Sequence, residues 1–323
     1  MIADSDSSLS KVVSPTKSRG ATQQMTGSKP IPERARRTRV ELTGSGGITL
    51  IADVAGDPSG TPVVLLHGGG QTRHAWGTTL DTLAASGFWA LTVDLRGHGE
   101  SDWAPDGDYR IDAFADDVRA IAESFDQPPA LVGASLGGIS SLTAIGEQID
   151  EPVARALVLV DVAPQMETAG RDRIGDFMRE NMDSGFGSLE EVADAIQRYN
   201  PHRPRPSDLT GLSKNLRERN GRWYWHWDPA FLRGRLGAFD ETRTSLTDST
   251  RLENAARALT LPTLLVRGRM SDLLSEEGAQ AFLSLVPHAQ MVDVAGAGHM
   301  VAGDRNDAFN DAVVGFLEGT RLP

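Results

Sequence analysis

The sequence predicts a doubly wound, mostly parallel eight-stranded α/β sheet with an inserted α-helical cap. Strand and helix patterns alternate from about residue 39 onward, which favours parallel strands joined by helices. Several strands, such as 63–66 and 157–160, are apolar on both faces, as is typical of strands covered by helices on both sides. Between about 164 and 246 the alternation stops. In such a fold the reactive groups lie at the carboxyl ends of the strands.

Eight β-runs are expected, each apolar or alternating, at 39–42, 48–54, 63–67, 89–95, 130–135, 156–162, 263–267 and 290–294. Helical periodicity fits 75–86, 111–125, 136–147, 276–285 and 306–318. The predicted α/β core therefore consists of two parts, 39–163 and 247–323, on either side of a cap at 164–246.

The expected cap contains short amphipathic helices at 171–181, 189–198 and 208–219, and no convincing β-run. An aromatic cluster follows at 223–227. Indole rings commonly fill the joint between a cap and a core, and they can equally form a surface for substrate. Trp225 is the candidate substrate contact from this cluster.

The composition is that of a globular enzyme: 323 residues with 39% hydrophobic residues can bury a sizeable core. The absence of cysteine excludes a disulfide framework, a thiolate nucleophile and cysteine-ligated metal. A net charge of −12 argues against nucleic acid or an anionic membrane as a partner. No apolar stretch approaches the roughly 18 residues of a membrane span. We expect a cytoplasmic protein and leave its oligomeric state open.

Residues 1–38 differ from the rest in being rich in Ser, Thr, Lys and Arg. This composition favours a disordered basic tail, and the alternative is a basic docking segment.

Ser135 is the predicted nucleophile. It ends the apolar run 130–134 in the pattern Gly-x-Ser-x-Gly, and a helical run follows at once. A sharp strand-to-helix turn needs small residues at positions 133 and 137, where side chains would collide with neighbouring backbone. The turn exposes the serine hydroxyl, and the helix aims its first amides at the same point.

The triple glycine after His67 is the predicted source of an oxyanion hole. Glycines let a backbone N–H approach a developing negative charge without hindrance, so we assign the hole to the amides of Gly69 and Leu136. A phosphate cradle is the alternative, but no Gly-Lys-Ser/Thr sequence accompanies it.

His299 is the predicted general base, because it lies in a glycine-rich loop between the last strand and the final helix. Asp272, which follows the run 263–267, is preferred as the acid that orients it, and Asp161 at the end of the run 156–160 is the competitor. The order Ser135, Asp272, His299 is that of serine hydrolases of this topology. His67 and His98 are interpreted as structural, and no histidine pair has metal-ligand spacing.

Together, these motifs resemble the α/β-hydrolase superfamily, in the branch similar to epoxide hydrolases, cofactor-free haloperoxidases and C–C hydrolases. The matching residues include the turn 94–101, of pattern Asp-x-Arg-Gly-His-Gly-x-Ser, and the pair Gly298-His299. Epoxide hydrolases and haloalkane dehalogenases carry an aspartate nucleophile, so Ser135 excludes their chemistry.

The resemblance implies a cofactor-free serine hydrolase of small to medium carboxylic esters, working through an acyl-enzyme on a small-molecule substrate. Arg73 and His74, just after the glycine loop, are candidate substrate contacts, with Arg73 suited to a carboxylate-bearing monoester or exposed to solvent. The alternatives are a C–C hydrolase of a vinylogous diketone and a non-catalytic ligand receptor on the same fold.

Overall fold

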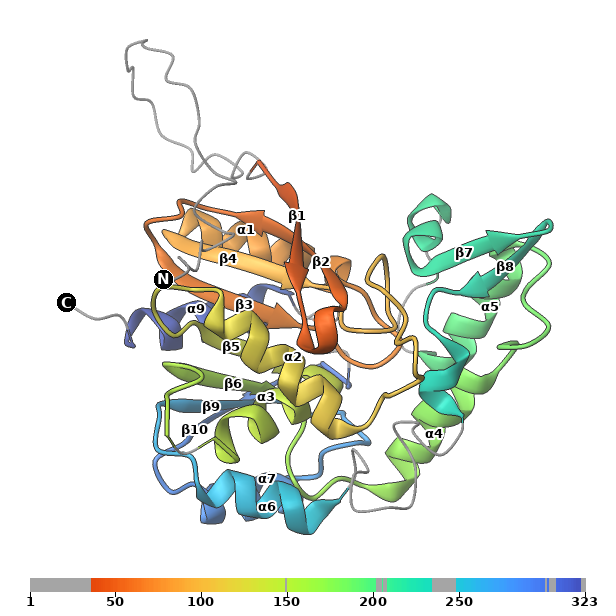
Figure 1. Ribbon diagram of the computed structural model, residues 1–323. Coiled ribbons are helices and arrows are strands. Elements are labelled where there is room, and N and C mark those ends of the chain that lie inside the picture. The colour runs from red at the N-terminus through yellow and green to blue at the C-terminus, as the bar shows by residue number, and fades with distance from the viewer. Residues whose placement is uncertain are drawn as a thin grey trace, which may run out of the picture.

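The computed structural model describes residues 36–148, 150–201, 205, 208–233, 248–299, 301 and 306–320. Its centre is an eight-stranded sheet of order β1-β2-β4-β3-β5-β6-β9-β10 (Figure 1). The strands are β1 (Thr38–Thr43), β2 (Thr49–Ala55), β3 (Thr61–Leu66), β4 (Phe88–Val93), β5 (Ala130–Ala134), β6 (Ala156–Val160), β9 (Thr263–Gly268) and β10 (Gln290–Val294). The pairs β1–β2 and β2–β4 are antiparallel, and all other neighbouring strands in this sheet are parallel. The eight predicted strands and the mostly parallel sheet are confirmed.

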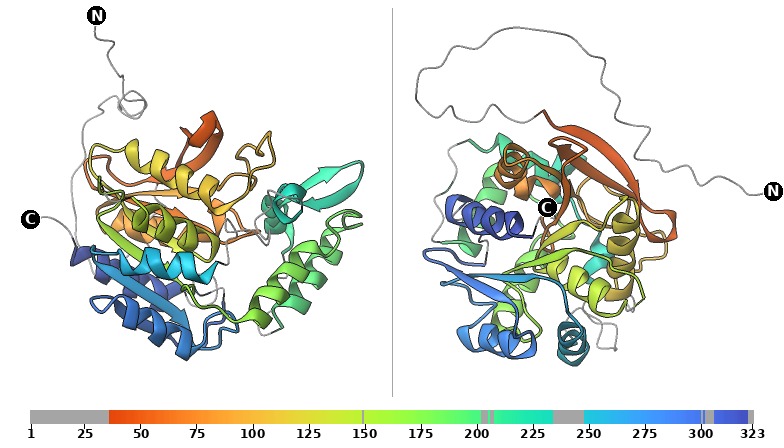
Figure 2. Two further views of the ribbon diagram at one scale, coloured as in Figure 1. Left: turned by 60° about the horizontal axis from the view of Figure 1, so that its bottom comes forward. Right: turned by 90° about the vertical axis from the view of Figure 1, so that its left-hand side faces the viewer.

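Helices cover both faces of the sheet, as the prediction of doubly wound strands requires. Val64 and Leu66 of β3 pack into one apolar cluster with α2 (Ile111–Glu123), α3 (Leu136–Gly146), α6 (Ser249–Arg257) and α7 (Glu276–Leu285). Val63 and Leu65 pack into the other with α1 (Gly77–Ala85) and α9 (Asn306–Glu318). The two helical layers are visible on opposite sides of the sheet in Figure 2. Alternate residues of one strand thus serve two cores.

The segment between β6 and β9, called here the inserted segment, differs from the expected all-helical cap. Its described elements are α4 (Thr168–Arg179), α5 (Leu189–Tyr199), the 3-10 turns η3 (Thr210–Asn215) and η4 (Pro229–Leu232), and the strands β7 (Leu216–Arg219) and β8 (Arg222–Trp225). The two strands form an antiparallel hairpin. Residues 234–246 of the predicted cap lie outside the described residues.

The predicted helix at 208–219 is therefore wrong, and the reason is the turn that follows it. Asn220 and Gly221 both have positive φ, 52° and 73°. An Asn-Gly pair in this conformation connects two hairpin strands and matches their twist. This turn chemistry outweighs the helical spacing of the leucines before it.

Other boundaries differ little from the predictions. The expected helix at 75–86 is divided into a 3-10 turn, η2 (Arg73–Trp76), and α1. The helix α6 was not predicted. Residues 1–35 of the expected tail lie outside the described residues, and Thr38 already belongs to β1. None of the described helices is long and apolar enough to cross a membrane.

Candidate active site

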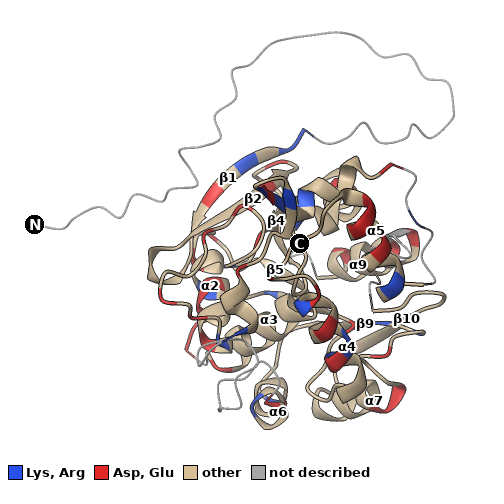
Figure 3. Ribbon diagram, turned by 90° about the vertical axis from the view of Figure 1, so that its right-hand side faces the viewer, with Lys and Arg blue, Asp and Glu red and all other residues tan. Residues whose placement is uncertain are grey.

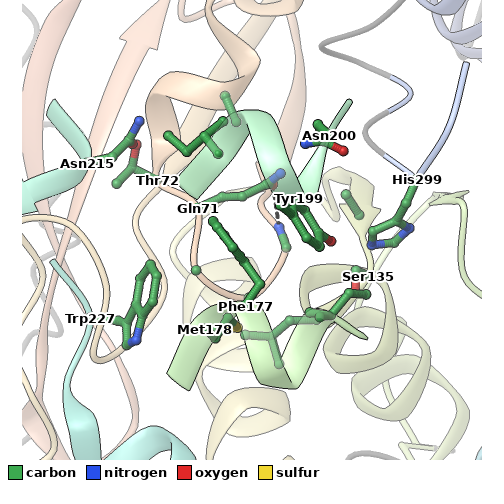
Figure 4. Close-up of a pocket in the computed structure, with 18 of the residues that line it drawn as sticks. Gln71, Thr72, Ser135, Phe177, Met178, Tyr199, Asn200, Asn215, Trp227 and His299 are labelled. Atoms are coloured by element: carbon green, nitrogen blue, oxygen red, sulfur yellow. Dashed lines mark hydrogen bonds between the residues drawn. The ribbon is translucent and has the colours of Figure 1, made fainter. Parts of the chain in front are cut away.

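A cavity of about 690 Å³ lies where the carboxyl ends of the central strands meet the inserted segment (Figure 4). Its floor includes the glycine loop after β3 and Ser135. Its walls are largely apolar side chains of the inserted segment, among them Ile174, Phe177, Met178, Leu212, Trp225, Trp227 and Phe231. Such a site suits a small molecule with a substantial apolar part.

Ser135 occupies the sharp turn that the sequence predicts. Its backbone has φ 45° and ψ −110°, a conformation that costs energy for any residue with a side chain. A Cβ at Gly137 would lie 2.3 Å from the carbonyl oxygen of Leu66, and one at Gly133 would lie 2.5 Å from the backbone of Gly137. Only glycine fits at either position, so β5 and α3 can close tightly and leave the Ser135 side chain at the cavity.

His299 lines the same cavity, and its partner is Asp161. The imidazole Nδ1 lies 2.8 Å from Asp161 Oδ2, and the Asp161 side chain is fully buried. In Figure 4 the hydroxyl of Ser135 lies beside the imidazole of His299. The structure thus brings Ser135 and His299 together at the cavity, with the buried Asp161 hydrogen-bonded to His299.

The preference for Asp272 is corrected by this geometry. Asp272 forms an ion pair with Arg173 of α4, with Nε 2.7 Å from Oδ2, and its side chain is 40% exposed. Asp272 lies one residue beyond the position after β9 whose side chain points toward Asp161. Ser271 occupies the position that faces inward, and its hydroxyl donates to Asp161 Oδ2 at 2.5 Å.

Asp161 is fixed by the backbone as well as by side chains. It has a positive φ of 53°, and its amide donates to the carbonyl of Val266 at 2.7 Å. Its other carboxylate oxygen accepts the Gly268 amide at 2.9 Å. With Ser271 and His299, three donors hold this buried carboxylate in one orientation.

The glycine loop after β3 passes beside Ser135. A Cβ at Gly68 would lie 3.4 Å from the Cβ of Ser135, and one at Gly69 would lie 3.6 Å from the ring of Phe231. Leu136 is the first residue of α3, so its amide has no acceptor within the helix. The amides of Gly69 and Leu136 remain the candidate donors.

Arg73 does not face the cavity, contrary to the carboxylate-binding hypothesis and to the solvent-facing alternative. Its guanidinium is 5% exposed and forms ion pairs with Asp94 at 2.5 Å, Asp53 at 3.1 Å and Glu100 at 3.4 Å. Burial opposes its charge, but these carboxylates outweigh burial and raise the pKa of Arg73. A substrate carboxylate would have to compete with three anions already in place.

The other two substrate-contact candidates do line the cavity. His74 is partly exposed there, and burial, with Arg73 nearby, lowers the pKa of its imidazole. Trp225 stacks on Trp227 with ring centroids 4.9 Å apart, and its indole N–H donates to the Glu180 carbonyl. Trp225 therefore packs within the inserted segment and also forms part of the cavity wall. The two interpretations of the aromatic cluster, packing and a surface for substrate, are compatible for this residue.

Three fully buried histidines surround the glycine loop: His67, His98 and His226. Burial lowers the pKa of His67 to about 4 and that of His98 to about 3. Burial and the neighbouring imidazoles hold the pKa of His226 well below its usual value. All three rings are neutral near pH 7. His67 and His98 are the two that we interpreted as structural from the sequence.

These histidines predict acid instability. An unfolded histidine takes up a proton near pH 6.5, whereas the folded protein keeps these three neutral, so the unfolded state binds more protons below that pH. The free energy of unfolding is expected to fall by up to about 1.4 kcal/mol per pH unit for each histidine below pH 6.5. Urea unfolding of wild type and His226→Gln between pH 8 and 5 measures this. The variant is expected to lose stability less steeply, and parallel pH profiles would contradict the prediction.

Known proteins with similar sequences and structures agree with the fold. The alpha/beta hydrolase family model matches residues 63–312. An esterase of Mycobacterium tuberculosis is 30% identical over 300 residues, covering 90% of this chain and 90% of that protein. The 2-(acetamidomethylene)succinate hydrolase of Mesorhizobium japonicum is 29% identical over 258 residues, covering 80% of this chain and 88% of that enzyme. A solved structure of the M. tuberculosis esterase has a TM-score of 0.69 at 27% identity, covering 88% of this chain and 93% of that one.

The chain belongs to the alpha/beta hydrolase family. It is a hydrolase, and the resemblance to the α/β-hydrolase superfamily that we inferred from its motifs is confirmed.

Proposed function

We propose that this protein is a serine esterase that cleaves small to medium carboxylic esters. The observation that carries the proposal is the placement of Ser135, on its strained turn, in one cavity with His299, whose imidazole is hydrogen-bonded to the buried Asp161. The similarity to a mycobacterial esterase supports the same reaction.

In the proposed reaction the Ser135 hydroxyl attacks the ester carbonyl while His299 Nε2 takes its proton. Asp161 accepts a hydrogen bond from Nδ1, which fixes the tautomer and stabilises the imidazolium. The amides of Gly69 and Leu136 hold the oxyanion, each worth roughly 3 kcal/mol of barrier. His299 then protonates the leaving alcohol, and a water molecule hydrolyses the acyl-enzyme by the same route.

The walls of the cavity favour a substrate with a substantial apolar part. Phe177, Met178 and Trp227 offer carbon surface to the cavity that Ser135 also lines (Figure 4). The outer face of α5 carries the exposed acids Glu190, Glu191 and Asp194 (Figure 3), which would repel anions on approach. We propose that the inserted segment acts as a cap that supplies this apolar wall.

Steady-state hydrolysis of p-nitrophenyl esters from acetate to decanoate tests the proposal. We expect kcat/KM to rise from acetate to a medium chain length, because each added methylene buried against the wall contributes about 0.8 kcal/mol. Sustained turnover of any of these esters excludes a ligand receptor. A C–C hydrolase would instead prefer a ring-fission product bearing a vinylogous diketone. Absence of turnover across the ester series would contradict the proposed function.

A further inference from the structure

We propose that His226 is a positioning residue through which the inserted segment holds the oxyanion loop, residues 68–70, in its working conformation. The inference rests on the proposed function, since it assigns the loop the task of presenting the Gly69 amide. It is carried by the hydrogen bonds that three buried imidazoles make to successive peptide groups of this loop.

The first two imidazoles come from the core. His67 Nδ1 lies 2.8 Å from the carbonyl oxygen of Gly68, and its Nε2 accepts the amide of Leu95. The Gly68 carbonyl and the Gly69 N–H belong to the same planar trans peptide and point in opposite directions. By holding the carbonyl, His67 sets the direction of the Gly69 N–H. His98 Nε2 accepts the Gly70 amide at 3.1 Å and so fixes the next peptide plane.

The third imidazole comes from the inserted segment. His226 Nε2 donates to the carbonyl oxygen of Gly70 at 3.3 Å, which fixes the peptide plane that follows. Its Nδ1 accepts the amide of Gly99 at 2.6 Å, so its tautomer is set by the core. His226 thus joins the oxyanion loop to the turn after β4, and Gly70 is held at both its N–H and its C=O.

The packing around the loop leaves it little freedom once these bonds form. Gly70 has φ 74°, and a Cβ there would lie 3.1 Å from Met178 and 3.2 Å from Trp227. The ring of Phe231, which faces Gly69, packs edge-on against His98 with centroids 4.9 Å apart. Two residues of the inserted segment beside His226, Trp227 and Phe231, therefore cover the loop that His226 bonds.

Two substitutions test the hydrogen bonds of the two His226 ring nitrogens separately. In His226→Gln the side-chain NH₂ reaches the position of Nε2 and can still donate to Gly70. In His226→Asn the side-chain oxygen replaces Nδ1 and can still accept from Gly99, but the bond to Gly70 is lost. We expect His226→Asn to lower kcat for p-nitrophenyl esters by about 10- to 100-fold with KM nearly unchanged, and His226→Gln to restore most of that loss.

His288→Asn is the matched control. This exposed histidine also lies next to a backbone carbonyl, that of Leu261 at 3.0 Å, at a site remote from the cavity lining. It is expected to leave kcat and KM unchanged.

Hydrogen exchange of the amides of residues 68–71 provides a readout that needs no substrate. Faster exchange in His226→Asn, but not in His226→Gln or His288→Asn, supports the proposal. Equal exchange in wild type and His226→Asn, or equal loss of kcat in the Asn and Gln variants, would overturn it. If wild type turns over no ester, the proposed function fails, and the exchange comparison alone decides whether His226 holds the loop.

Discussion

Ser135→Ala is expected to reduce ester turnover by roughly 10⁴-fold or more, the largest effect of any single substitution in this chain. The alanine keeps the Cβ that the turn already accommodates, so α3 and β5 retain their packing. What is lost is the oxygen that attacks the carbonyl. Turnover of p-nitrophenyl butyrate by the purified variant, with circular dichroism to confirm folding, measures the effect.

Ser141→Ala provides the matched control within the same helix. The Ser141 hydroxyl donates to the carbonyl of Gly137 at 2.8 Å and is buried away from the cavity lining. Its removal is expected to alter kcat by no more than a few-fold. Esterase activity that survives in Ser135→Ala would refute the assignment of the nucleophile.

Asp161→Asn is expected to cost roughly 10³- to 10⁴-fold in kcat. An amide at this position can present N–H to His299 Nδ1, which favours the tautomer that cannot accept the proton of Ser135. Asp272→Asn is expected to change kcat less than about threefold, because it weakens only a partly exposed ion pair with Arg173. Comparing kcat of the two variants at pH 8 tests the assignment.

If Asp272→Asn is instead the more damaging change, the acid lies after β9 and His299 must adopt another position during turnover. A loss of similar size in both variants would also contradict the assignment, because Asp272 is bonded to α4 and has no described contact with His299.

The sheet was predictable from sequence because buried parallel strands have a direct signature. The residues 63–66 and 157–160 are apolar without alternation, and both strands lie within the sheet between helical layers. The hairpin β7–β8 was not predicted, although Asn220-Gly221 is a strong turn signal. Its strands are only four residues long, and β7 (Leu-Arg-Glu-Arg) lacks the apolar run that marked the core strands. The aromatic residues of β8 suggested packing between cap and core rather than a strand.

Ser135 and His299 could be proposed as nucleophile and base from local patterns, whereas choosing a candidate acid required three-dimensional information. Asp161 and Asp272 both follow a strand, and both lie between Ser135 and His299 in the chain, so chain order does not distinguish them. One signal in the sequence favoured Asp161: it follows five apolar residues directly, and a carboxylate so buried must be paired. The Ser271 side chain shows that the inward-facing position after β9 is one residue earlier than Asp272.

Arg73 was misassigned for a related reason. Its partners Asp53 and Asp94 lie on β2 and directly after β4, and only the strand order β2-β4-β3 brings them to the start of η2. The sequence shows that Arg73 lies close to the oxyanion loop, but it does not show in which direction the guanidinium points.

Covalent labelling of wild type by a fluorophosphonate tests most directly whether Ser135 is the nucleophile. The serine oxygen attacks phosphorus and displaces fluoride, which leaves a stable phosphonyl ester that mass spectrometry can locate. The account predicts one adduct per chain, on Ser135, with loss of esterase activity in proportion to labelling and no adduct in Ser135→Ala. Stoichiometric labelling of another residue, or full esterase activity in protein labelled on Ser135, would contradict it.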